Sequence, residues 1–400
     1  HMLDIKITNA KTRNTGKELV EIGIENGKIT AIASAVEGEA KQVIDAKGNL
    51  VTESFVNGHL HLCKVYTLEM AGQAALKEYN DNNMGGAMTS IERAADFKAC
   101  YDEKWIIENV RKACDLAVKY GNTHIRAFAD VDSKARLEGV KGVIRGREEY
   151  KDRLDIQVVA FPQDGVAREP GAKELIKQAM DLGADVVGGI PWIEFTEEEL
   201  DHVNSMCNYA KEYDKDISML LDDVGDAEER TLEMLCKKVI EMGWQGRATA
   251  QHCRAMELYP ENYFRKLVSL LKKAQIGVVS DPHTGPLHAR VKDLLKAGVP
   301  VALGQDDIAD AYYPYGECNM LQVAFLASHL LHMVSFDDME LLYDMITTSA
   351  AKVLGIKNHE LKEGGDADLV VLQDEDVYHA IWHHTAPAYV IKNGVDITVK

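Results

Sequence analysis

Residues 54–62 read SFVNGHLHL, an apolar run that ends in two histidines two positions apart. Side chains alternate between the faces of a β-strand, so His59 and His61 would point to the same side, roughly 7 Å apart along the backbone. Two imidazoles on one face can bind a single metal ion when other parts of the chain supply further ligands. The fold must therefore bring more polar side chains to the end of this strand.

From residue 54 onward, strand-like runs alternate with amphipathic helical stretches. Eight such runs occupy residues 54–62, 122–131, 155–163, 184–191, 216–223, 246–252, 276–282 and 299–307. Continuous apolar runs are typical of parallel strands that are buried on both faces. Eight strand–helix units close most naturally into a TIM (β/α)8 barrel, so the sequence predicts an α/β fold of this kind.

Both ends of the chain have a different pattern, with short β-rich runs separated by turn residues. Residues 3–8, 19–25 and 28–34 read as an antiparallel sheet, residues 367–373 as a further strand, and KNG at 392–394 as a hairpin turn. We expect one small β-sandwich domain built from both termini. Its parts would be residues 1–52 and 359–400, and the TIM-barrel catalytic domain would span 53–358.

Residues 64–100 are longer than a usual connection between a strand and the next helix, and they include NDNNMGGAMTS. Over a barrel mouth such a segment is interpreted as a lid insertion. Lys64, which directly follows the histidine pair, is either a surface or lid lysine or a substrate contact.

Polar residues gather at the carboxyl ends of the predicted strands, where barrel active sites form. They are His59, His61, Asp130, Gln163, Asp222, Asp223, His252, Asp281, Asp306 and Asp307. Any one of them could be a helix cap, but their repetition over most of the strands predicts one common site.

The composition limits the partners. Asp plus Glu number 64 against 45 Lys plus Arg, a net charge of −19, which repels nucleic-acid backbones and anionic lipids. No apolar run approaches the ~18 residues of a membrane span, and the seven cysteines form no CxxC pair. We expect a cytoplasmic homo-oligomer with a small neutral or cationic substrate, and no nucleic-acid or membrane partner.

The HxH motif, the late GQDD at 304–307 and the β-domain from both termini resemble the amidohydrolase superfamily over nearly the whole chain. Within it the chain is most similar to cytosine deaminases and N-isopropylammelide hydrolases. The matching segments include IRAFADVD, LDIQVVAFPQDG, LGADVVGGIP, GRATAQH and DDIADAYYPYGECNMLQ. Those enzymes hydrolyse C–N bonds at an amidine-like ring carbon, which a metal-bound hydroxide attacks.

The resemblance implies a role for each matching residue. His59, His61 and Asp306 would bind one divalent metal, and neutral imidazoles with a carboxylate suit zinc or iron. Asp306 would also take a proton from the bound water, and His252 would stabilise the attacking hydroxide. Asp223 would protonate the ring nitrogen.

The resemblance also implies a substrate site. Gln163 would hydrogen-bond a ring carbonyl or ring nitrogen, Asp307 would contact the leaving amino group, and Tyr312 would line the pocket. We therefore expect a metal-dependent hydrolytic deaminase of a small cyclic amidine or amino N-heterocycle that releases ammonia. Cytosine, isocytosine, aminotriazines and creatinine all fit, the last in a creatinine deaminase-type member. The alternatives are hydrolysis of a ring amide or an N-alkylamine, and a metal-free heterocycle-binding protein.

The chain departs from the family at the fifth predicted strand. Where cytosine deaminases have a metal-binding histidine in a segment such as DVHCDE, this chain has ISMLLDD with Leu220, and the following glutamate is replaced by Asp223. Leucine cannot bind a metal. The favoured interpretation is that His252 or Asp222 fills the vacancy, because four buried polar residues kept in one cavity would otherwise only cost desolvation energy.

Two other interpretations remain open. In one, the ion takes a ligand from elsewhere, such as Cys63, His283 or His288. In the other, the metal is lost altogether.

Overall fold

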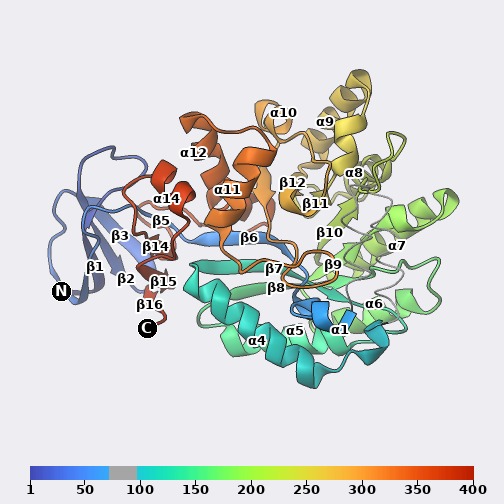
Figure 1. Cartoon of the computed structure of the whole chain (residues 1–400), viewed down its shortest axis with the longest axis horizontal. Coiled ribbons are helices and arrows are strands. Elements are labelled where there is room, and N and C mark those ends of the chain that lie inside the picture. The colour runs from blue at the N-terminus through green and yellow to red at the C-terminus, as the bar shows by residue number, and fades with distance from the viewer. Residues whose placement is uncertain (72–96) are drawn as a thin grey trace.

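The computed structural model of the chain describes residues 1–71 and 97–400. An eight-stranded parallel sheet forms a barrel at its centre, and two four-stranded sheets lie together at one end (Figure 1). The chain begins in one of these small sheets, passes through the barrel and returns to the other.

The barrel strands pair with one another in chain order, each with the next. They are β6 (Phe55–Leu60), β7 (Asn122–Asp130), β8 (Asp155–Phe161), β9 (Val186–Gly189), β10 (Asp216–Leu221), β11 (Ala248–His252), β12 (Gly277–Ser280) and β13 (Val301–Leu303). All eight predicted runs form strands, so the TIM-barrel expectation is confirmed. The first and last strands meet just beyond β13, where the His61 amide donates to the Asp306 carbonyl at 2.8 Å and the Asp306 amide to the His59 carbonyl at 2.7 Å.

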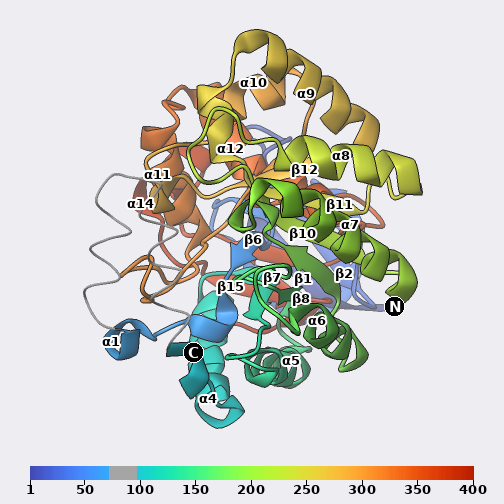
Figure 2. The same cartoon turned by 90° about the vertical axis from the view of Figure 1, so that its right-hand side faces the viewer.

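Helices surround this barrel, as seen from the side in Figure 1 and turned by 90° in Figure 2. They are α1 (Leu68–Ala71), α4 (Glu103–Lys119), α5 (Glu138–Tyr150), α6 (Ala172–Asp181), α7 (Thr196–Tyr213), α8 (Thr231–Met242), α9 (Glu261–Ala274), α10 (Val291–Lys296), α11 (Met320–Leu330), α12 (Phe336–Asp344) and α13 (Thr348–Val353). Most of them pack their apolar faces on the strands in one large core, and α13 packs on β6, β12 and β13 in a smaller one.

Short 3-10 helices follow four of the strands at the mouth of the barrel: η1 (Leu62–Lys64), η3 (Pro191–Ile193), η4 (Arg254–Leu258) and η5 (Pro282–Thr284). A further one, η2 (Lys98–Cys100), comes just before α4. The greater part of the predicted lid insertion, residues 72–96, lies outside the described residues.

The two small sheets combine both termini, as predicted. One has the order β3 (Lys28–Ala33), β2 (Val20–Glu25), β1 (Met2–Ala10), β4 (Glu39–Asp45), and the other has the order β16 (Val395–Asp396), β15 (Tyr389–Lys392), β14 (Leu369–Val371), β5 (Val51–Glu53). Side chains of both sheets form one apolar core. The helix α14 (Val377–His383) lies between β14 and β15 in the chain.

One detail of the first sheet differs from the expectation. The strands β1, β2 and β3 are antiparallel, but β4 pairs in parallel with β1. The sequence EAKQVID of β4 carries alternating polar residues and only one fully buried apolar side chain, Ile44, so its strand signal is weak.

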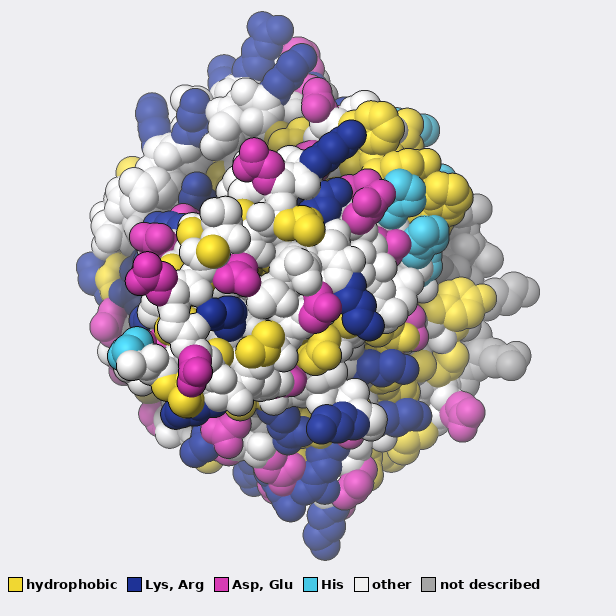
Figure 3. All heavy atoms as spheres, turned by 90° about the vertical axis from the view of Figure 1, so that its left-hand side faces the viewer, with side chains coloured by type: hydrophobic (Ala, Val, Ile, Leu, Met, Phe, Trp, Pro, Cys, Tyr) yellow, Lys and Arg dark blue, Asp and Glu magenta, His cyan; other side chains and the backbone are white. Residues whose placement is uncertain are grey.

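The surface at the sandwich end mixes charges of both signs. Lys and Arg side chains are interspersed with Asp and Glu over this face, without a continuous basic patch (Figure 3). Within residues 1–71 and 97–400, no helix has both the length and the apolar character required to cross a bilayer.

Candidate active site

The predicted site residues converge on one small cavity at the carboxyl ends of the barrel strands. Its lining consists of His61, Gln163, Ile190, Trp192, Leu220, Asp223, His252, Asp306, Asp307 and Tyr312. His59, which is fully buried, lies beneath this lining. Side chains from β6, β10, β11 and the loops after β8, β9 and β13 therefore share one space.

The two histidines of the HxH motif point to the same side, as strand alternation predicts. Their Nε2 atoms lie 3.0 Å apart. The Oδ1 atom of Asp306 lies 3.0 Å from Nε2 of His59 and 3.3 Å from Nε2 of His61. Two imidazole nitrogens and a carboxylate oxygen thus meet at a single point.

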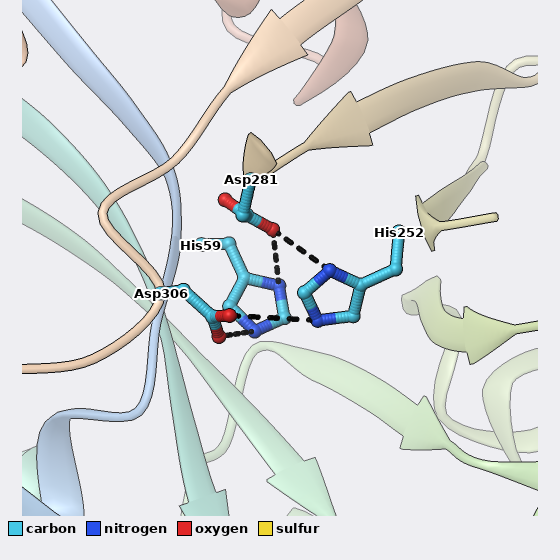
Figure 4. A group of neighbouring side chains, drawn as sticks. All are labelled: His59, His252, Asp281 and Asp306. Carbon is cyan, nitrogen blue, oxygen red and sulfur yellow. Dashed lines mark ion pairs between the residues drawn. The ribbon is translucent and has the colours of Figure 1, made fainter. Parts of the chain in front are cut away.

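His252 and Asp281 complete this cluster (Figure 4). His252 Nδ1 lies 3.1 Å from Asp281 Oδ2, and His252 Nε2 lies 3.8 Å from Asp306 Oδ2. His252 and Asp306 both have a φ of +67°, a left-handed backbone that aims each side chain inward as its strand segment ends. Asp281 was noted at a strand end but given no role; SDPHTG after an apolar run was the available signal.

Gln251 fixes the tautomer of His59. The Gln251 side-chain nitrogen donates to Ser218 Oγ at 3.0 Å and to the Gly58 carbonyl at 3.4 Å. Its oxygen therefore faces His59 Nδ1, at 2.7 Å, and accepts the proton of that nitrogen. The lone pair of His59 Nε2 therefore points toward His61 Nε2 and Asp306 Oδ1. This is the usual arrangement of a metal-binding histidine.

The protonation states suit a cation. Burial lowers the pKa of His61 to about 4 and, with Arg254 nearby, the pKa of His252 to about 3, so both stay neutral. The His59 pKa is raised, because Asp306 and Asp281 outweigh the effect of burial. Both carboxylate oxygens of Asp281 are buried without a hydrogen bond. These residues fit a divalent metal. Such an ion would take the place of the second proton, on His59 Nε2, and leave the Nδ1 proton with Gln251.

Leu220 faces the cavity, whereas Asp222 points away from the metal-binding cluster. Leu220 lines the cavity at the position where the family resemblance predicts a metal-binding histidine. Asp222 does not reach the cluster: its Oδ1 accepts from Thr231 N and Oγ1, both at 2.7 Å, and its Oδ2 accepts from Tyr259. The strand ends at Leu221 and Asp222 has a φ of +46°, so the alternation that predicted a shared face no longer holds there. The expectation that Asp222 could fill the vacancy is wrong.

The other alternative ligands also lie away from the histidine pair. The buried Cys63 thiol accepts from the Asp130 amide at 3.3 Å. His283 Nε2 lies 2.9 Å from the Gln305 carbonyl, and His288 lies in a different pocket on the surface side of α10. Among the described residues, none of the three is within the histidine–aspartate clusters at the barrel mouth.

Asp223 is held by an arginine that sequence reasoning missed. Its Oδ1 lies 2.8 Å from Arg254 Nη1, and Arg254 Nη2 donates to Thr284 Oγ1 at 2.6 Å. Thr284 in turn donates to Asp306 Oδ2 at 2.7 Å. A continuous polar chain thus links Asp223 to Asp306.

Lys64 is a buried residue of the site rather than a surface lysine. It is 4% exposed, its ammonium lies 3.1 Å from Asp130 Oδ2, and it donates to the side-chain oxygen of Gln163. The Gln163 nitrogen lies 3.4 Å from the Tyr312 hydroxyl. The Lys64 ammonium also lies 5.3 Å from the centre of the Tyr312 ring, a cation–π contact.

Asp307 is buried beside Asp306 with one carboxylate oxygen lacking a hydrogen bond. Burial and the nearby charges of Asp306 and Asp310 hold its pKa well above the usual range. With this residue, the structure brings every predicted site residue except Asp222 into the cavity or the histidine–aspartate cluster.

The family model described as "Amidohydrolase family" matches residues 42–396. The chain belongs to the amidohydrolase family. Hydrolases of this family act on C–N bonds, and the buried His/Asp cluster of this one is consistent with a divalent metal.

Individual relatives cover almost the whole length. The chain is 33% identical to N-isopropylammelide isopropyl amidohydrolase of Pseudomonas sp. (strain ADP), over 94% of this chain and 92% of that protein. It superposes on 5-methylcytosine deaminase from Klebsiella pneumoniae, liganded with 5-fluorocytosine, with a TM-score of 0.90, 29% identity and coverage of 99% and 97%. N-isopropylammelide isopropylaminohydrolase from Burkholderia multivorans has the same fold, with a TM-score of 0.86, 22% identity and 98% coverage of both chains.

Proposed function

We propose that this amidohydrolase is a metal-dependent hydrolytic deaminase of a small cyclic amidine or amino N-heterocycle, from which it releases ammonia. The observation that carries the proposal is the meeting of His59 Nε2, His61 Nε2 and Asp306 Oδ1 within 3.3 Å beside a small cavity that His61 and Asp306 line. The 29% identical relative at near-complete coverage is a 5-methylcytosine deaminase, which supports this reaction class.

The metal would be held by His59, His61 and Asp306, with His252 in place of the histidine that Leu220 replaces. Zinc or iron suits this set of nitrogen and oxygen donors. Such an ion supplies a nucleophilic water at neutral pH.

The chain's own residues would move the protons. The Asp306 carboxylate accepts the proton that the attacking water loses. Arg254 holds Oδ1 of Asp223, so the other oxygen of Asp223 is the one available to pass a proton to the ring nitrogen. Proton transfer to nitrogen is required because an amine leaves poorly as an anion.

The cavity favours a ring with a carbonyl oxygen. Lys64 occupies the side-chain oxygen of Gln163, so Gln163 offers an N–H donor to the substrate. Asp307 would contact the amino group that leaves, and Tyr312 and Trp192 provide aromatic walls. Cytosine, isocytosine, creatinine and ammelide each combine an amidine carbon with a carbonyl.

A second candidate is hydrolysis of an N-alkylamino or ring-amide bond. The observation that favours it is the 33% identity, over 94% of this chain, with a hydrolase of N-isopropylammelide. The same metal and carboxylates would serve, and the product would be an alkylamine or an opened ring instead of ammonia.

The test is product release from protein whose metal content has been measured. Ammonia would be assayed with cytosine, isocytosine, creatinine and ammelide, and isopropylamine with N-isopropylammelide. Ammonia from one ring, with about one metal per chain, supports the deaminase; isopropylamine alone selects the second candidate. No product from any ring, with no metal retained, would favour a heterocycle-binding protein, and thermal stabilisation by a ring would then detect binding.

A further inference from the structure

Two loops that line the cavity are joined by side chains that do not line it. The loop after β8 carries Gln163, and the loop after β9 carries Ile190 and Trp192. The relative position of these loops sets the distance between the polar and the aromatic wall of the cavity. Glu194 belongs to the second loop, directly after η3, and His202 lies on the following helix α7; both side chains are buried.

Glu194 binds three consecutive backbone amides of the first loop. Its Oε2 accepts from Val166 N at 2.7 Å and from Ala167 N at 2.9 Å, and its Oε1 accepts from Arg168 N at 3.1 Å. The approach is close: a Cβ atom at Gly165, where φ is +95°, would lie 2.6 Å from Glu194 Oε1. Glycine at this position therefore permits the contact.

His202, which is fully buried on α7, ties Glu194 to the start of the second loop. Its Nδ1 lies 2.8 Å from Glu194 Oε2, and its Nε2 accepts from the Ile190 amide at 2.9 Å. Since Nε2 accepts, Nδ1 carries the ring proton and donates to Glu194. One unbroken series of hydrogen bonds thus runs from the amides of 166–168 through Glu194 and His202 to Ile190.

The same two loops meet at a second point. The Arg168 guanidinium donates to the carbonyl of Ile193 at 3.1 Å. Burial disfavours the charged Glu194, yet its hydrogen bonds to His202, Ala167 and Val166 lower its pKa to about 2. The carboxylate therefore stays ionised and remains an acceptor for all four donors.

We propose that Glu194 and His202 are positioning residues that hold the Gln163 loop and the Trp192 loop in register, and so set substrate affinity and ring selectivity. The effect on substrate rests on the proposed function, whereas the coupling of the loops does not. In Glu194→Gln, an amide NH2 group replaces one of the two acceptor oxygens, and buried backbone N–H groups lose their partner. The loop should then loosen while the metal cluster stays intact.

Hydrogen exchange tests the coupling without any activity. In Glu194→Gln, amides 166–168 should exchange at least about tenfold faster than in the wild type, because their buried acceptor is weakened. Exchange in β6 and β11 should be unchanged. Glu197→Gln, the same change at an exposed site three residues away, is the control and should behave as the wild type. Unchanged exchange at 166–168 in Glu194→Gln would overturn the proposal.

Kinetics tests the consequence for substrate. With a ring that the wild type turns over, Glu194→Gln should raise KM about tenfold or more, with a smaller fall in kcat and unchanged metal content. A fall in kcat with unchanged KM, or a loss of metal, would overturn the positioning role. If Glu194→Gln does not fold, His202→Gln replaces it in both tests with the same expected results. If the wild type turns over no ring, the proposed function fails and hydrogen exchange alone decides the coupling.

Discussion

The Nε2 atoms of His59 and His61 lie 3.0 Å apart, with Asp306 Oδ1 within 3.3 Å of both. Neutral imidazole nitrogens this close bring their lone pairs together unless a proton or a metal ion lies between them. Gln251 holds the proton of His59 on the far nitrogen, which favours the metal.

Asp306→Asn should lower kcat/KM by about a thousandfold or more, because it removes both an anionic metal ligand and the proton acceptor. The fold should persist, since the substitution keeps shape and size. Steady-state kinetics, metal analysis and circular dichroism would measure this. Asp152→Asn, at an exposed position, is the control. A variant with near-normal kcat would refute the role given to Asp306.

Gln251→Leu should weaken metal binding by about 10- to 100-fold, the usual cost of losing the group that orients a metal-binding histidine. The Gln251 side chain touches His59 but lies behind it, so the three donor atoms remain. Competition with a chelator would measure the affinity. Ser218→Ala removes one of the two acceptors of the Gln251 side-chain nitrogen and should have a smaller effect. Equal affinities of Gln251→Leu and the wild type would contradict this reading of the tautomer.

Leu220→His should tighten metal binding by about tenfold or more, ~1.4 kcal/mol, because Leu220 lines the cavity beside His252 and a histidine there would add a nitrogen ligand. Chelator competition again gives the affinity. Leu221→His, at the next position, is the matched control: Leu221 lies in the barrel–helix core and should only lose stability. Weaker metal binding in Leu220→His would mean that the site is complete without this position.

Lys64→Met should destabilise the protein by about 3–5 kcal/mol, because it leaves the buried Asp130 carboxylate without its ammonium partner. Asp130 keeps the Tyr101 hydroxyl, at 2.9 Å. The buried Lys98 ammonium also acts on it, but Lys98 pairs directly with Asp132 and Asp164 and so does not replace the lost ion pair. Urea unfolding would measure the loss. The double variant Lys64→Met/Asp130→Asn should recover part of it. If the single and double variants were equally destabilised, the ion pair would not be the cause.

The free energy of unfolding should fall by about 2 kcal/mol between pH 5 and pH 8 as Glu229 loses its proton, after allowance for solvent screening. Burial and the nearby charges of Glu199 and Asp222 raise its pKa from 4.5 to about 8. The folded protein therefore binds the proton more tightly than the unfolded chain. This stabilisation is complete below pH 4.5 and is lost as the pH rises through about 8.

In Glu229→Gln the free energy of unfolding should change less with pH, as measured by urea unfolding at pH 5.5, 7 and 8.5. Glu228→Gln, at the exposed neighbouring position, should keep the pH dependence of the wild type. A decline of equal slope in Glu229→Gln would assign the pH dependence to other groups.

Much of the site could be predicted because strand geometry is local. The alternation of a single strand places His59 and His61 on one face, and the structure shows them so. Asp306 and His252 could be expected at the barrel mouth because the carboxyl ends of all parallel strands meet there. Asp222 could not be placed in this way, since a left-handed residue after the strand turned its side chain toward α8.

The sequence by itself determined the eight-stranded barrel, the terminal β-sandwich and the end of the barrel where the polar residues gather, because these follow from hydrophobic period and strand count. Only the tertiary structure decided which atoms meet. Gln251 contacts His59, Arg254 contacts Asp223, and Glu194 binds the amides of 166–168. These pairs lie on different strands and loops, and nothing in the local pattern of either partner specifies the other. Their contacts depend on the closure of the barrel and on loop turns, which form only when the whole chain packs.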